Sequence, residues 1–85
     1  MAIERKSYVT FTEIIPDKKR KTKIWRVDSI HGDLLGEVLW FGRWRCYTFH
    51  PAAATIFNSG CLDDISMFAR MQTREHIYTR ARESA

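Results

Sequence analysis

Among the cysteine and histidine side chains, whose types can perform nucleophilic or metal chemistry, the candidates are His31, Cys46, His50 and Cys61. Cysteine and histidine are common ligands of tetrahedral zinc, and a thiol beside an imidazole can form an activated nucleophile. The spacing argues against both uses. In an extended strand Cys46 and His50 point to the same face but lie about 13 Å apart, and neither cysteine has a second one two to four residues away. We therefore predict no metal site.

Other sets of catalytic residues are also missing from the sequence. It contains no glycine-rich phosphate loop, no paired-carboxylate motif and no HExxH pair. A nucleophile needs a base and an orienting group beside it, and no such set can be recognised. We predict a protein that is not an enzyme and binds no cofactor. Cys46 and Cys61 are expected to be reduced thiols that line the core.

The charge distribution gives a first binding hypothesis, a sequence-independent nucleic-acid-binding protein. The net charge is +4, yet residues 24–69 sum to −2, so the basic groups lie towards the two ends. Basic groups neutralise phosphates, and aromatic rings stack on bases. Asp28, Asp33 and Glu37 of the same predicted meander oppose this alternative, because they would repel phosphates. Its candidate residues are Lys18, Lys19, Arg20 and Lys21 of a basic loop, with Arg26 and Tyr47 of the sheet.

The second hypothesis places a protein partner, or a second copy of the chain, at the turn around Gly42. Its candidate residues are Phe41, Arg43, Trp44 and Arg45. Aromatic residues and arginine dominate the energetics of interfaces. A competing role for Trp44 is to close the core against Trp25. If neither role holds, the helix face at 67–74, which carries methionine and arginine, is the next candidate.

Hydrophobic periodicity and turn residues predict the elements that position these side chains. Alternation predicts strands at 23–30, 34–41 and 44–49, joined by a strand at 8–15, while 55–57 could add a fifth. A helix is expected over 60–73, with helical character that could continue to residue 78. The strands and the apolar helix stripe each need a partner layer. We therefore predict an α+β fold, a small antiparallel β-meander of three to five strands packed against one C-terminal α-helix.

Several local features of these elements can also be predicted. Residues 31–33 form a three-residue hairpin loop with glycine in the left-handed position. Gly36 marks a bulge or a place where a ring lies over the backbone. Pro51 ends the fourth strand, because it has no amide hydrogen. Residues 58–60 cap the helix, and the acidic pair 63–64 falls in its first turn, where the macrodipole favours negative charge.

The predicted core combines the inward strand positions with the helix stripe. It consists of Trp25, Val27, Val38, Trp40, Leu62, Ile65 and Phe68, joined by Leu35 and Phe49. A domain of 85 residues buries only about 60–65% of its unfolded surface, so each large side chain matters.

The length of 85 residues predicts a single domain. We expect an ordered core at about 7–78, a basic loop at 16–22 and a frayed tail at 79–85. No apolar run approaches the roughly 20 residues that span a bilayer, and residues 1–6 do not read as a signal peptide. We therefore expect a soluble, cytoplasmic protein.

A spaced pattern of aromatic, glycine and aliphatic residues covers about half of the chain, from Trp25 to Phe68. It reads WxV, LGxVxW, WRxYxFxP, F and CLxxIxxF. The pattern resembles that of a group of small uncharacterised proteins encoded in bacteriophages, prophages and bacterial genomes. The resemblance implies a mobile-element accessory protein and transfers no functional residue. Together with the residues above, it predicts a non-enzymatic binding module that acts on a host macromolecule, with a protein favoured over nucleic acid.

Overall fold

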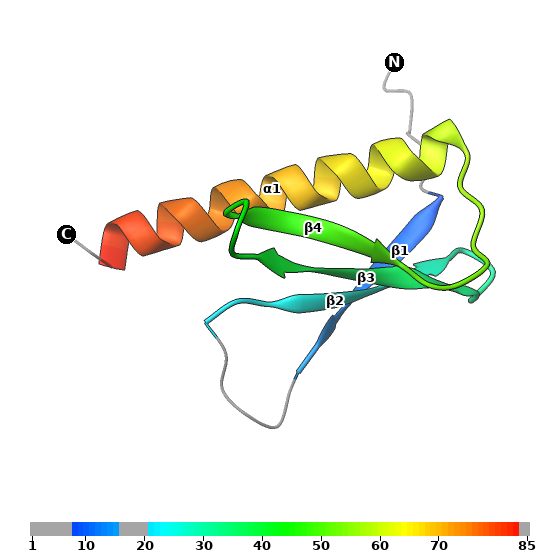
Figure 1. The fold of residues 1–85 in the computed structure, drawn as a ribbon, viewed down its shortest axis with the longest axis horizontal. Helices are drawn as coiled ribbons and strands as arrows, with labels where there is room; N and C mark the ends of the chain where they lie inside the picture. The colour runs from blue at the N-terminus through cyan, green and yellow to red at the C-terminus, as the bar shows by residue number, and fades with distance from the viewer. Residues whose placement is uncertain (1–7, 16–20, 84–85) are drawn as a thin grey trace, which may run out of the picture.

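The computed structural model describes residues 8–15 and 21–83. Within these residues the strands are β1 (Val9–Ile14), β2 (Ile24–Ser29), β3 (Leu34–Phe41) and β4 (Cys46–Pro51), and the helix is α1 (Ser59–Glu83). The sheet is an antiparallel meander in the order β1-β2-β3-β4. α1 crosses one face of it (Figure 1). The predicted α+β fold is confirmed. Residues 55–57, which lie in the described part of the chain, form no strand.

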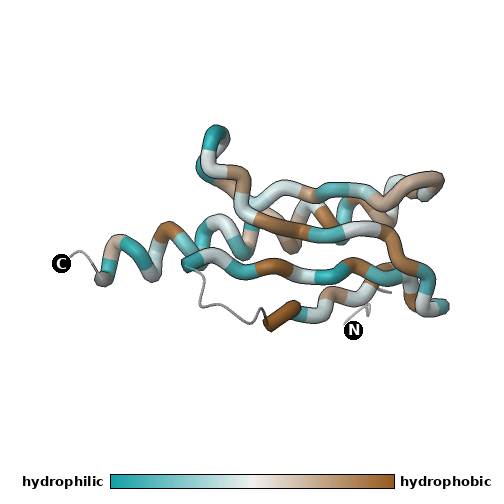
Figure 2. The backbone as a smooth tube through the Cα atoms, turned by 60° about the horizontal axis from the view of Figure 1, so that its bottom comes forward, coloured by the Kyte–Doolittle hydropathy of each residue, from teal (hydrophilic) through white to brown (hydrophobic). Residues whose placement is uncertain are grey.

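The core lies between α1 and the sheet face that it covers. Its buried hydrophobic residues are Val9, Trp25, Val27, Leu35, Val38, Tyr47 and Ile65. Trp40, Phe49 and Phe68 are half-buried and pack against this cluster. Hydrophobic and hydrophilic residues are interspersed along the strands in Figure 2.

The prediction for Leu62 was wrong, because 50% of this residue is exposed. Cys61, four residues before Ile65, packs against the core instead. Residues four apart share a helix face, so Cys61 lies on the same core-facing side of the helix as Ile65. Leu62 lies beside this face and is partly exposed. Val9 and Tyr47 are core residues that the sequence pattern did not identify.

α1 is attached to both edge strands of the sheet. On the β1 side, the Phe68 ring stacks on Phe11 with centroids 3.8 Å apart and meets Trp25 edge-on at 5.0 Å. The backbone N–H of Tyr8 donates a 2.9 Å hydrogen bond to the Asp64 carboxylate. On the β4 side, the backbone N–H of Tyr47 donates to the Thr73 hydroxyl at 2.9 Å. The helix therefore bridges the two ends of the meander.

The helix begins as predicted but continues further. The Asn58 side-chain oxygen accepts the Cys61 backbone N–H at 2.8 Å, which is N-cap geometry. The first turn holds no acidic residue among the described side chains, because the pair 63–64 lies one turn later than predicted. α1 ends at Glu83, beyond the predicted end at 73 and beyond residue 79, where fraying was expected. No helix in the described part of the chain is long and apolar enough to cross a membrane.

Gly36 shows both features that were predicted for it. The register between β2 and β3 shifts at Val27/Asp28, so β3 carries a bulge here. A side chain at Gly36 would also meet the Phe49 ring at 2.9 Å and the backbone carbonyl of His50. Pro51 is the last residue of β4 and still pairs with Gly36. Pro51 therefore ends the strand, two residues beyond the predicted strand end at residue 49.

Candidate functional site

The β3–β4 hairpin turns through residues 42–45, so β4 begins at Cys46 rather than at the predicted residue 44. The Phe41 carbonyl accepts the backbone N–H groups of Trp44 at 3.1 Å and Arg45 at 2.9 Å. Arg45 has φ of 54°, in the left-handed region that glycine and asparagine normally occupy. We call residues 42–45 the hairpin tip.

Trp44 is 69% exposed at the hairpin tip, and it does not close the core against Trp25. Trp25 is instead contacted by the rings of Tyr47 and Phe68. Trp44 meets only the Phe41 ring among the described aromatic contacts, edge-on with centroids 4.9 Å apart. Of the two roles predicted for Trp44, the core role is therefore wrong.

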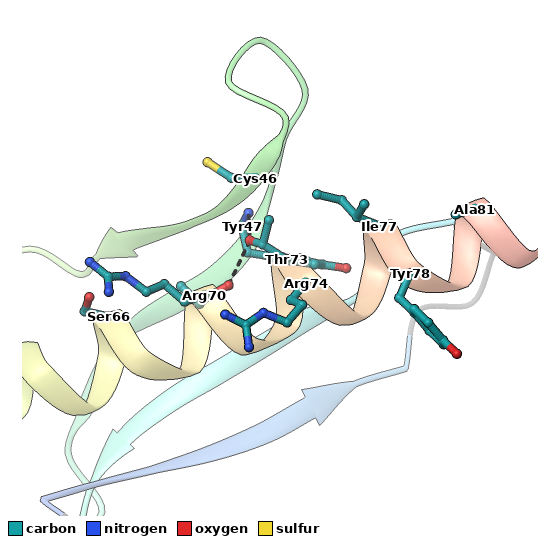
Figure 3. A pocket seen from close by; sticks show the side chains of 10 residues that line it. Cys46, Tyr47, Ser66, Arg70, Thr73, Arg74, Ile77, Tyr78 and Ala81 are labelled. Atoms are coloured by element: carbon teal, nitrogen blue, oxygen red, sulfur yellow. Dashed lines mark hydrogen bonds between the residues drawn. The ribbon is translucent and has the colours of Figure 1, made fainter.

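A groove of about 830 Å³ lies between α1 and β4 (Figure 3), and we call it the α1–β4 groove. It is lined by Cys46, Tyr47, Ser66, Ala69, Arg70, Thr73, Arg74, Ile77, Tyr78 and Ala81. The helical residues recur at spacings of mostly three and four, so they follow one side of α1 for about 22 Å.

Thr73 fixes the position of α1 beside β4. Its hydroxyl accepts the outward N–H of Tyr47 and donates to the Ala69 carbonyl at 2.8 Å. Figure 3 shows Thr73 on α1 next to Tyr47 on β4. Because β4 is an edge strand, its outward N–H groups would otherwise be open to a pairing strand. Thr73 thus covers part of the edge and sets the width of the groove.

The groove combines an apolar surface with positive charge. Ala69, Ile77 and Ala81 give it aliphatic surface, and Ile77 is 55% exposed. Arg70 and Arg74 are exposed and extend from α1 beside it (Figure 3). No aspartate or glutamate is among the described residues that line it. The groove therefore complements a segment that carries both apolar side chains and carboxylates.

A smaller pocket of about 440 Å³, which we call the basic pocket, shares Ile77 with the groove. It is lined by Lys21, Thr22, Trp40, Gly42, Arg45, His76, Ile77 and Arg80. The basic side chains come from three separate segments: residues 21–22 before β2, the hairpin tip and α1. The Trp40 and His76 rings are 4.5 Å apart.

The structure separates the residues that were predicted for nucleic-acid binding. Tyr47 is 5% exposed, and its hydroxyl accepts the Lys23 backbone N–H at 3.0 Å. A ring buried in this way cannot stack on a base, so the prediction that Tyr47 contacts nucleic acid was wrong. Arg26 is half-exposed and pairs with Asp28 at 2.9 Å on the same strand. Lys21 lines the basic pocket. Lys18, Lys19 and Arg20 lie outside the described residues.

The thiols and imidazoles that the sequence offered for metal chemistry do not form a cluster. Cys46 and Cys61 are free cysteines and half-buried. The His50 ring is 2.8 Å from the Thr48 hydroxyl on the same strand. Within residues 8–15 and 21–83, no three His, Cys, Asp or Glu side chains are arranged to hold a metal ion.

Sequence reasoning missed most residues of the groove. Of the helix face at 67–74, only four residues line it, and the rest of its helical wall extends to Ala81. One signal was available: Ser66, Arg70, Ile77 and Ala81 follow four-, seven- and four-residue steps, which place them along one side of a continuous helix. The prediction placed the helix at 60–73, left its continuation to residue 78 open and expected fraying from residue 79, so this line was not followed to Ala81. Phe41 and Arg43 line neither the groove nor the basic pocket.

No family model matches the chain, and no curated protein and no solved structure matches it.

Proposed function

We propose that the protein is a non-enzymatic binding module that holds an acidic, partly apolar segment of a host protein in the α1–β4 groove. One observation carries this proposal. The groove has aliphatic surface from Ile77 and two alanines, and its only described charged residues are Arg70 and Arg74. A partner with apolar side chains gains by leaving water, and its carboxylates gain charge-assisted hydrogen bonds to arginine.

The size of the groove is consistent with a peptide-like occupant. A helical wall of about 22 Å matches four turns of a partner helix or about six to seven residues of an extended strand. The outward N–H of Tyr47 already donates to the Thr73 hydroxyl. The start of β4 therefore lacks this backbone donor for pairing with an added strand. An amphipathic helix laid beside α1 therefore fits the groove better than an added strand.

The exposed hairpin tip supports the same proposal. Trp44 belongs to the hairpin that contributes Cys46 and Tyr47 to the groove. An exposed tryptophan on an ordered hairpin is the type of residue that anchors interfaces. We assign Trp44 to the edge of the partner site, with Arg43 as a peripheral charge.

The experiment that tests this function is site-specific photo-crosslinking in a host-cell extract. A photoreactive phenylalanine analogue is placed at Ser66, which is exposed and lines the groove, and in a control protein at Glu75, which is exposed on α1 and does not line it. The crosslinked peptides are then sequenced by mass spectrometry. We expect adducts at Ser66, absent at Glu75, whose peptides combine acidic and apolar residues.

The same crosslinking experiment is repeated with variants in which arginines of α1 are replaced by glutamate. Arg70→Glu with Arg74→Glu should remove the Ser66 adduct, whereas Arg82→Glu on the same helix should keep it. The proposal fails if Ser66 and Glu75 yield the same adducts, if the peptides are basic, or if the double charge reversal leaves crosslinking unchanged.

A further inference from the structure

Three charged side chains of α1 have no oppositely charged neighbour on the helix. Residues three and four apart lie side by side on a helix surface. Asp63 has only serine, glycine and methionine at these distances, while Arg70 and Arg74 are four apart and repel each other. Within residues 8–15 and 21–83, none of the three forms an ion pair. A carboxylate placed between the two arginines would remove their repulsion.

The helix dipole does not account for these positions. The dipole favours carboxylates in the first turn and cations in the last turn, and its effect falls off beyond them. The first turn of α1 holds no acidic residue among the described side chains, and the basic residues of its last turn are Arg80 and Arg82. Asp63, Arg70 and Arg74 therefore need another explanation.

These charges share one side of α1 with apolar surface. Asp63, Ser66, Met67 and Arg70 line a hollow of about 540 Å³, and Ser66 and Arg70 also line the α1–β4 groove. Met67 is 50% exposed, and Ile77 further along is 55% exposed. The start of α1 is thus itself an acidic, partly apolar segment, which is the kind of segment that the groove complements.

A second copy of the chain, with its α1 antiparallel to the first, brings the opposite charges together. A two-fold axis between residues 67 and 68 places residue 63 of one helix level with residue 72 of the other, midway between Arg70 and Arg74. The symmetry repeats the same contact in the other direction. Paired helices lie about 8–10 Å apart, a distance that aspartate and arginine side chains span together. The two helices overlap over residues 59–76, which is about five turns.

The same register gives the end of α1 a partner that the sheet does not provide. It brings Ile77 level with residue 58 of the other copy, at the start of its helix. Directly before this helix, Ile56 is 93% exposed. Met67 of both copies lies beside the axis, and half of this residue is exposed in the single chain. Apolar groups therefore leave water at the centre and at both ends of the pair.

We propose that two copies of the chain form a dimer through antiparallel α1 helices, with Asp63 of each copy between Arg70 and Arg74 of the other. The contact is small, so we expect a reversible dimer with a dissociation constant of about 10–100 µM. The dimer engages both arginines of the α1–β4 groove. A host segment therefore binds in competition with the second copy, and this consequence alone rests on the proposed function.

Sedimentation equilibrium of the full chain tests the dimer, at about 5 µM to 1 mM protein and about 50 mM salt. We expect a shift from monomer to dimer over this range. Raising the salt to about 500 mM should weaken association by at least about threefold, because exposed ion pairs are screened. Asp63→Lys should raise the dissociation constant by at least about tenfold, since it replaces both attractions by repulsions. Glu75→Lys makes the same charge change on another side of the same helix and should leave association unchanged.

Complementary variants test the pairing itself. Arg70→Glu with Arg74→Glu should also dissociate the dimer, because it brings three carboxylates together. In an equimolar mixture of this variant with Asp63→Lys, both contacts again join opposite charges. The mixture should associate within about threefold of the wild type, although each variant alone is dissociated. The melting temperatures of the variants should equal that of the wild type, because the substituted side chains are all exposed.

Three results would overturn the proposal. The first is a wild type that is monomeric at about 1 mM. The second is a dimer whose dissociation constant is unchanged in Asp63→Lys. The third is a mixture that stays monomeric although each variant melts like the wild type. None of these measurements uses the host partner. A monomeric wild type with an intact Ser66 adduct therefore contradicts only the dimer, and a dimer without a host adduct contradicts only the proposed function.

Discussion

The two parts of α1 differ in what surrounds them. Residues 59–76 lie over the sheet, and Ile65 there is 4% exposed. Residues 77–83 extend past the sheet (Figure 1), and Ile77 there is 55% exposed. Short helices are only marginally stable without packing, so contacts with the sheet do not account for the last two turns. We conclude that packing on the sheet fixes the position of residues 59–76. Residues 77–83 instead present apolar and basic surface outside the core.

The largest expected effect compares one isoleucine from each part. Ile65→Ala should lower the free energy of unfolding by about 3 kcal/mol, because it leaves a cavity among Val9, Trp25 and their neighbours. Ile77→Ala should lower it by less than about 0.5 kcal/mol, since the side chain is already in water. Urea denaturation followed by tryptophan fluorescence measures both. Equal losses in the two variants would contradict the division of α1.

The next effect concerns Thr73, which lies in the first part of α1, about one turn before the second part begins. Thr73→Val keeps the shape but removes the acceptor of the Tyr47 N–H, so we expect a loss of about 1–2 kcal/mol. The amide hydrogen of Tyr47 should then exchange faster with solvent. Thr73→Ser keeps the hydroxyl and should restore slow exchange. Unchanged exchange in Thr73→Val would show that α1 does not cover the edge of β4 in solution.

The sequence predicted the sheet and the first part of α1 well, because each has a periodic apolar face. Trp25, Val27 and Val38 follow strand alternation, and Ile65 and Phe68 follow the helix period. Helical character was predicted as far as residue 78, and the extension to Glu83 was missed because the apolar stripe that marks the covered face does not continue past Phe68. The apolar stripe is present only where α1 packs against the sheet. It therefore cannot predict a helical segment that extends beyond the sheet.

The candidate site was harder to predict, since it depends on how the hairpin sits against α1. The cluster at the hairpin tip was visible in the sequence, and the exposure of Trp44 agrees with a surface role. Its relation to Arg70 and Ile77 comes from the Thr73 contact across 26 positions. Hydrophobic periodicity in the sequence cannot predict a contact between two residues so far apart in the chain. Tyr47 was misplaced because an aromatic strand residue reads the same whether it stacks on a base or packs in the core.

The smallest expected effect on stability is that of Trp44→Ala. The indole is mostly in water, so the free energy of unfolding should change by less than about 0.5 kcal/mol. Capture of the host partner should nevertheless decrease, because the proposal assigns the exposed Trp44 of the same hairpin as an interface anchor. Thermal melting and quantitative capture on the same samples test this. A lowered melting temperature with unchanged capture would return Trp44 to a structural role.

The most direct measurement compares partner capture by Ile77→Ala and Leu62→Ala. Both residues are aliphatic, on α1 and about half exposed, at 55% and 50%, but only Ile77 lines the groove. Each immobilised variant is incubated with host extract, and the protein identified by the Ser66 crosslink is quantified by mass spectrometry. We predict that Ile77→Ala reduces capture of this protein by about tenfold, whereas capture by Leu62→Ala equals that of the wild type. The melting temperatures of both variants should equal that of the wild type. Equal capture by the two variants would contradict the assignment of the α1–β4 groove.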